Sequence, residues 1–132
     1  MKVKNNLHIM FIDNDRHVRD SLKVLFDTSR TQFLIFKSGE QGLNSLKYQQ
    51  VSLVVSDYFL PDMDGIEFLK QAARIQPGVR RILMATIASE GLEQEIIEAG
   101  IDRFIEKPLT VASLDTVINE LKPLNLSNQS WR

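Results

Sequence analysis

The sequence contains no cysteine, and this absence excludes disulfide bonds, thiolate nucleophiles and cysteine-ligated zinc. It also lacks an apolar run long enough to span a membrane, and its first residues, Met1 to Asn6, do not have the pattern of a signal peptide. We therefore expect a cytoplasmic protein that does not interact with a membrane.

An excess of charge of one sign is also missing. Sixteen Lys and Arg balance seventeen Asp and Glu, which gives a formal net charge of −1. A domain that binds nucleic acid by itself usually carries clustered positive charge, so we expect no direct nucleic-acid binding. The 132 residues, 43% hydrophobic and 25% charged, have the composition of one ordinary globular domain. We assign it residues 1–122 and interpret residues 123–132, which begin with proline and are rich in Asn and Ser, as a tail or linker stub.

Short apolar runs alternate along the chain with segments whose apolar residues have helical spacing. The runs predict five strands, at 7–12, 33–36, 51–56, 81–85 and 101–105. The segments between and after them predict five helices, with apolar faces that include Val18, Leu22, Leu25 and Phe26, then Leu43 and Leu46, then Ile66, Leu69 and Ala73, and finally Leu114, Val117, Ile118 and Leu121. Because the strands are apolar throughout, the pattern favours a parallel sheet covered on both faces, a doubly wound α/β fold.

Three local signals predict helix ends. Ser38 with Gln41, and Asp64 with Glu67, have the spacing of capping pairs at helix starts. Gly100 stands where the fourth predicted helix should end, at a position that favours positive φ.

Polar side chains gather at the predicted strand ends. In open α/β sheets, ligands bind beyond the carboxyl ends of the strands, where the strand order reverses. The residues at those ends are Asp13, Asn14 and Asp15 after the first strand, Asp57 after the third, Thr86 after the fourth, and Lys107 with Pro108 after the fifth. Paired acids with room for water suit Mg²⁺, and a hydroxyl and an ammonium are donors to phosphoryl oxygens. This rim therefore predicts phosphoryl transfer.

The segment Asp57-Tyr58-Phe59-Leu60-Pro61-Asp62-Met63-Asp64-Gly65 resembles the phosphoacceptor segment of receiver domains from bacterial two-component response regulators. The resemblance extends over roughly residues 7 to 122, and the further matching positions are Asp13, Thr86, Phe104, and Lys107 with its usually cis Pro108. It implies the flavodoxin-like (βα)5 fold, a five-stranded parallel sheet of order 2-1-3-4-5.

The resemblance also implies a function. Asp57 would accept a phosphoryl group from a sensor histidine kinase or a phosphotransfer protein, in a self-catalysed step rather than as a turnover enzyme. Asp13, Asp57 and the backbone carbonyl of Phe59 would hold Mg²⁺, with Asn14 or Asp15 as a further ligand.

The remaining matches imply a switch. Lys107 would hold a phosphoryl oxygen, and Thr86 with Phe104 would couple phosphorylation to an output face. That face would act on an effector domain or protein that the sequence does not identify.

Two positions depart from the family pattern. Asn14 stands where the family usually has a second acid directly on the metal, and Ile87 follows Thr86 where a small residue is usual. An amide oxygen ligates Mg²⁺ without contributing charge, and a branched side chain narrows access to the acceptor. These departures leave open a degenerate receiver, a protein-binding module that is not switched by phosphate.

The acidic loop also resembles the nucleophile motif of haloacid-dehalogenase-type phosphatases, in which Asp13 would be the nucleophile. That family needs a further acidic pair after a later strand. After Lys107 the only acids are Asp115 and Glu120, both on the last predicted helix, so the phosphatase hypothesis fails at this point.

Overall fold

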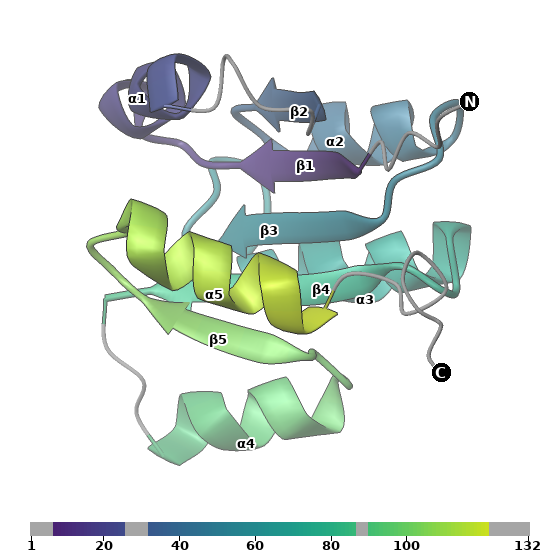
Figure 1. The fold of residues 1–132 in the computed structure, drawn as a ribbon. Coiled ribbons are helices and arrows are strands. Elements are labelled where there is room, and N and C mark those ends of the chain that lie inside the picture. Colours follow the sequence, from purple (N-terminus) through teal and green to yellow (C-terminus); the bar gives the residue numbers. More distant parts are fainter. Residues whose placement is uncertain (1–6, 26–31, 87–89, 122–132) are drawn as a thin grey trace, which may run out of the picture.

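The structure is a computed structural model that describes residues 7–25, 32–86 and 90–121. Its strands are β1 (His8–Ile12), β2 (Gln32–Phe36), β3 (Leu53–Asp57), β4 (Arg80–Ala85) and β5 (Arg103–Glu106). Its helices are α1 (Arg16–Leu25), α2 (Gly39–Leu46), α3 (Gly65–Ile75), α4 (Glu90–Glu98) and α5 (Val111–Leu121) (Figure 1). All neighbouring strands are parallel, and the predicted order 2-1-3-4-5 is confirmed.

Some predictions fall outside the described residues: Phe26 on the first helix, Ile87 after Thr86, and the tail at 123–132. No helix in the described part of the chain is both long enough and apolar enough to cross a membrane.

The third strand begins later than the predicted range 51–56. Val51 is buried, but its N–H donates to the side-chain Oε1 of Gln76 at 3.1 Å instead of joining the sheet. Strand pairing starts at Leu53 and continues through Asp57, so the acceptor candidate lies at the end of the third strand, as predicted.

The fifth strand also begins two residues after the start of the predicted range 101–105. The reason is the end of α4, where Gly100 has a φ of 72° and the N–H of Ile101 donates to the carbonyl of Ile96 at 3.1 Å. This hydrogen bond and the left-handed glycine form a helix C-cap, as the sequence predicted for Gly100. Because the Ile101 N–H belongs to this cap, it does not pair with the sheet. β5 therefore starts at Arg103.

Both predicted helix caps are present. The Ser38 hydroxyl accepts the Gln41 N–H at 3.2 Å, and the Asp64 carboxylate accepts the Glu67 N–H at 2.8 Å. The Gln41 side chain reaches back to the N–H of Lys37 at 3.2 Å, one residue before the cap. Asp64 is the N-cap of α3 and lies seven positions after Asp57, the last residue of β3, so the intervening loop is long and is held at both ends.

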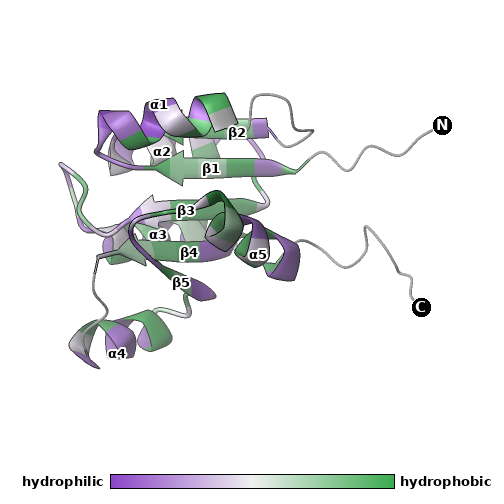
Figure 2. Ribbon diagram, turned by 60° about the vertical axis from the view of Figure 1, so that its left-hand side comes forward, coloured by the Kyte–Doolittle hydropathy of each residue, from purple (hydrophilic) through white to green (hydrophobic). Residues whose placement is uncertain are grey.

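Two apolar clusters fill the two sides of the sheet. The cluster under α1 and α5 includes Phe11, Val55, Ile82 and Leu114. The cluster under α2, α3 and α4 includes Ile12, Val54, Phe68 and Leu83. Figure 2 shows the hydrophobic strands of the sheet between the helices. In α3, Ile66 and Leu69 are buried as predicted, and Ala72 is buried as well, whereas the predicted Ala73 is only partly buried.

Helix α4 is held differently from the others, because none of its side chains is fully buried. The guanidinium of Arg81 in β4 donates to the carbonyls of Leu69, Ala99 and Gly100 at 3.2, 3.1 and 2.7 Å. A cation that binds the last carbonyls of a helix is favourable both as a hydrogen-bond donor and for the helix dipole. Arg81 thus fastens the C-terminal end of α4 to the sheet and to α3.

Candidate functional site

The carboxyl ends of four neighbouring strands bring the predicted polar residues to one rim. Asp13 follows β1, Asp57 ends β3, Thr86 follows β4 and Lys107 follows β5. The Nζ atom of Lys107 lies 3.3 Å from Asp13 Oδ2 and 3.3 Å from Asp57 Oδ1. Asp13 is fully buried and Asp57 is 7% exposed, so this triad is largely removed from solvent.

Backbone contacts on three sides fix Asp13. Its Oδ1 accepts the N–H of Asp15 at 2.8 Å, its own N–H donates to Phe36 at 3.1 Å, and its carbonyl accepts from the Arg19 guanidinium at 2.8 Å. Among the described residues, the buried Oδ2 has no partner other than the Lys107 ammonium, with which it forms an ion pair at 3.3 Å. A buried carboxylate oxygen with no further partner is costly, and a bound cation would satisfy it.

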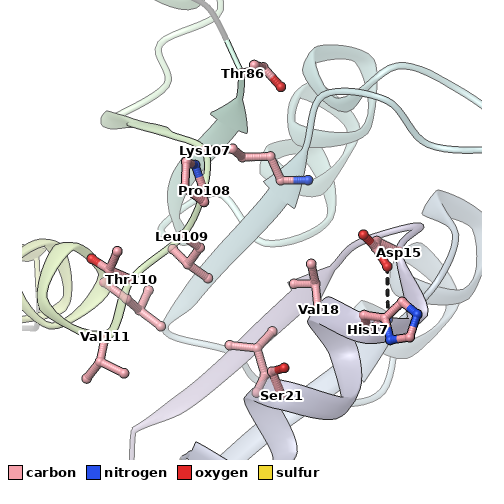
Figure 3. A pocket seen from close by; sticks show the side chains of 12 residues that line it. Asp15, His17, Val18, Ser21, Thr86, Lys107, Pro108, Leu109, Thr110 and Val111 are labelled. Carbon is pink, nitrogen blue, oxygen red and sulfur yellow. Dashed lines mark hydrogen bonds between the residues drawn. The ribbon is translucent and has the colours of Figure 1, made fainter.

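Asn14 and Asp15 are both exposed. Asp15 Oδ1 accepts the N–H of His17 at 2.9 Å, which caps the start of α1 (Figure 3). Within the described ranges, no group of three or more His, Asp or Glu side chains is close enough to hold a metal ion. The acids of the inner rim are therefore the pair Asp13 and Asp57.

The pKa values of the triad follow from burial and charge. Burial raises the pKa of Asp57 above its ordinary value of 3.8, and the charge of Asp13 raises it further, while the Lys107 ammonium and the Phe59 N–H act in the opposite direction. For Lys107, burial lowers the pKa, but attraction to the two carboxylates outweighs it and raises the pKa above 10.5. Two acids and one cation in a poorly hydrated place leave the site short of positive charge.

This charge arrangement predicts a pH dependence of stability for the metal-free protein. An acid with a raised pKa in the folded state binds its proton more tightly there, so ionised Asp57 costs stability. The cost is absent below pH 3.8, grows as the pH rises and is complete above the raised pKa. We expect Asp57→Asn to be more stable than the wild type at neutral pH, by a margin that disappears in acid.

Urea unfolding in EDTA at a series of pH values measures this margin, and Asp115→Asn, an exposed position on α5, is the control. A difference between wild type and Asp57→Asn that did not change with pH would show that the ionisation of Asp57 is not its cause.

The loop after Asp57 is closed at its base. The N–H of Tyr58 donates to the carbonyl of Met84 at 2.8 Å, and the N–H of Gly65 donates to the carbonyl of Tyr58 at 2.7 Å. A Cβ atom on Gly65 would collide with the Asp57 carbonyl oxygen and approach Tyr58 Cα to 2.9 Å. Gly65 is therefore required because the start of α3 passes directly over the backbone of the acceptor candidate.

Thr86 directly follows β4, and Phe104 lies on the neighbouring strand β5. Thr86 is exposed at the rim, and Phe104, which pairs with Leu83 across the two strands, is half-buried in the cluster on the α4 side. The peptide bond between Lys107 and Pro108 is cis.

Comparison with known proteins agrees with this geometry. A family model described as the response regulator receiver domain matches residues 9–119. The chain belongs to this family. Transcriptional regulatory protein FixJ of Bradyrhizobium diazoefficiens is 31% identical over 120 residues, which cover 88% of this chain and 58% of FixJ. A probable chemotaxis protein CheY of Rhizobium etli is 29% identical over 135 residues, which cover 92% of this chain and 100% of that protein.

The receiver fold is also found among solved structures. A CheY-like receiver domain from Methanospirillum hungatei superimposes with a TM-score of 0.82 at 28% sequence identity, covering 88% of this chain and 93% of that one. The family and fold predicted from the sequence are thus confirmed. Because this chain spans 58% of FixJ, the comparison with FixJ concerns the receiver domain alone.

One feature of this receiver domain was not predicted. A groove of about 500 Å³ runs between α1 and the segment after Lys107, with Val18 and Ser21 on one side and Leu109 and Thr110 on the other (Figure 3). It reaches the rim at Lys107 and Thr86. The sequence signal was Leu109 and Val111, apolar residues just before and at the start of the last helix that do not belong to its predicted apolar face.

Proposed function

We propose that this receiver domain is a phosphoacceptor in two-component signalling, with Asp57 as the phosphorylated residue. The observation that carries the proposal is the Lys107 ammonium, 3.3 Å from both the Asp57 and the Asp13 carboxylates. An Asp57 oxygen would form a bond to phosphorus while the bond from phosphorus to the imidazole nitrogen of a phosphohistidine donor breaks. Such a transfer needs positioning and charge neutralisation more than covalent assistance.

The residues at the rim fit Mg²⁺. Asp13 has a buried oxygen with no partner among the described residues other than the Lys107 ammonium, and the site lacks positive charge. Asp13, Asp57 and the Phe59 carbonyl would be the protein ligands, and we add the amide oxygen of Asn14, since Asp15 caps α1. When bound, Mg²⁺ supplies positive charge for the phosphoryl oxygens.

The other rim residues then have distinct roles. Lys107 would bind a phosphoryl oxygen in place of one of its carboxylate contacts. The exposed Thr86 hydroxyl would bind another, and the half-buried Phe104 would turn further inward, which alters the face formed by α4, β5 and α5. A coupling of this kind requires only about 1 to 3 kcal/mol of differential affinity between two states.

The partners follow from the same chemistry. The donor would be a sensor histidine kinase or a phosphotransfer protein, and the apolar groove beside Lys107 would accept part of its surface. The output would reach an effector domain or protein of unknown identity. We propose that the domain acts in the cytoplasm without itself binding nucleic acid or membrane, and that it is not a turnover enzyme.

The proposal is tested by incubating the chain with acetyl phosphate and Mg²⁺ and measuring its intact mass. The expected result is one added phosphoryl group with Mg²⁺ and none with EDTA. A folded protein that acquired no label would favour the degenerate receiver, for which the neutral Asn14 beside only two inner acids is the supporting observation.

Replacing Asn14 should alter metal affinity in a defined direction. Asn14→Asp adds a carboxylate where a neutral amide stands, so we expect Mg²⁺ to bind on the order of tenfold more tightly in calorimetry. Asp15→Asn is the matched control, because asparagine also caps helices, and its affinity should stay unchanged. Unchanged affinity in Asn14→Asp together with a loss in Asp15→Asn would transfer the ligand role to Asp15.

A further inference from the structure

The loop that follows Asp57 is tied to a helix far away in the sequence. Asp62, in the middle of this loop, accepts the N–H of Gly39 on Oδ1 at 2.9 Å and the N–H of Glu40 on Oδ2 at 2.8 Å. These are the first two residues of α2. Burial raises the pKa of Asp62, but the backbone N–H groups of Gly39, Glu40 and Asp62 itself together outweigh it and hold the pKa below its ordinary value of 3.8.

The contact extends beyond this carboxylate. A Cβ atom on Gly39 would lie 2.8 Å from the sulfur of Met63, so the loop packs directly against the start of α2. This helix already has its own cap, since Ser38 accepts the N–H of Gln41 at 3.2 Å. Asp62 therefore does more than complete α2, because it joins the loop to the neighbouring βα unit.

The rest of the loop connects Asp62 with the acceptor. The loop is closed at its base by the bond of 2.7 Å from the Gly65 N–H to the Tyr58 carbonyl. Within it lies Phe59, whose N–H faces the Asp57 carboxylate and lowers its pKa. The Phe59 side chain is 74% exposed and does not anchor this part of the loop in the core. Phe59 pairs with Asp64 in an isolated antiparallel bridge, and Asp62 lies between these two residues in the chain, where it is bound to α2.

We propose that Asp62 is a positioning residue for phosphoryl transfer: by clamping the loop to α2, it holds the Phe59 N–H toward Asp57 and the Phe59 carbonyl toward the metal. This inference rests on the proposed function of Asp57. Asp62 touches none of the reacting atoms, and its effect passes through the backbone of the loop. Displacement of a reacting group by a fraction of an ångström to 1 Å slows reactions strongly, by as much as about a hundredfold.

The test compares Asp62→Ala with Ser38→Ala in the full chain. Both variants remove acceptors from the first turn of α2, but only Asp62→Ala releases the loop. Two quantities are measured: the rate of labelling by acetyl phosphate with Mg²⁺, and the amide NMR shifts of Asp57 and Phe59 in metal-free protein. Asp62→Asn, which keeps one carbonyl acceptor, is the conservative variant.

We expect Asp62→Ala to slow labelling about tenfold and to shift the amide signals of Phe59 and Asp57, with Asp62→Asn intermediate. Ser38→Ala should leave both quantities at the wild-type value. Equal effects of Asp62→Ala and Ser38→Ala on both quantities would reduce Asp62 to a helix cap and overturn the inference. If the wild type were not labelled at all, the proposed function would fail, and unshifted amides in Asp62→Ala would then refute the clamp separately.

Discussion

Asp57→Asn will abolish labelling by acetyl phosphate, whereas Asp13→Asn will retain labelling at a greatly reduced rate. An amide does not form the acyl phosphate, so the loss in Asp57→Asn is complete. Asp13→Asn keeps the nucleophile and its contact of 3.3 Å with Lys107, but removes the buried oxygen that attracts a cation. Intact mass with Mg²⁺ over a time course separates the two outcomes.

The reverse pattern, with labelling lost in Asp13→Asn and kept in Asp57→Asn, would revive Asp13 as a phosphatase-type nucleophile. We do not expect unfolding to cause a complete loss in Asp57→Asn, because the raised pKa of Asp57 predicts a more stable variant at neutral pH. A circular dichroism spectrum of each variant is sufficient as the folding control.

Gly65→Ala should be the most damaging small substitution near the site. The added methyl group would collide with the backbone carbonyl of Asp57, and neither backbone can yield without moving β3 or α3. Adding a methyl group to a tightly packed position costs about 1 to 3 kcal/mol or more. We expect the free energy of unfolding, measured in urea, to fall by about 3 kcal/mol. Labelling of Asp57 should slow as well, since the strain falls on its own peptide.

Gly78→Ala is the matched control for this prediction. A Cβ atom at Gly78 meets nothing within 4 Å, and its φ lies outside the positive region. We expect unchanged stability or a gain of about 0.5 kcal/mol, because alanine restricts the unfolded chain more than glycine does. If Gly65→Ala unfolded at the same urea concentration as Gly78→Ala, this result would contradict the claim that α3 begins too close to the Asp57 backbone to admit a Cβ atom.

Much of this fold could be predicted because its signals are local. The apolar strands, the caps at Ser38 and Asp64 and the glycine at 100 each depend on neighbours within a few residues. The polar rim could be predicted because parallel strands share one carboxyl edge. Strand starts at Leu53 and Arg103 could not, because Val51 and Ile101 are apolar residues buried outside the sheet.

The parts of the site that the sequence missed depend on distant partners. Asp62 reaches α2 across 22 and 23 positions, and no spacing rule predicts that pair of hydrogen bonds. The groove beside Lys107 forms only when α1 and the start of α5 are packed on one face of the sheet.

The most direct measurement of the central claim is chemical trapping of the phosphorylated residue in the wild-type chain. The protein is labelled with acetyl phosphate and Mg²⁺ and then treated with borohydride, which reduces an aspartyl phosphate to homoserine and leaves free carboxylates intact. Peptide mass spectrometry then identifies the reduced residue. The account predicts homoserine at position 57 and at no other aspartate, and homoserine at position 13, or at none, would contradict it.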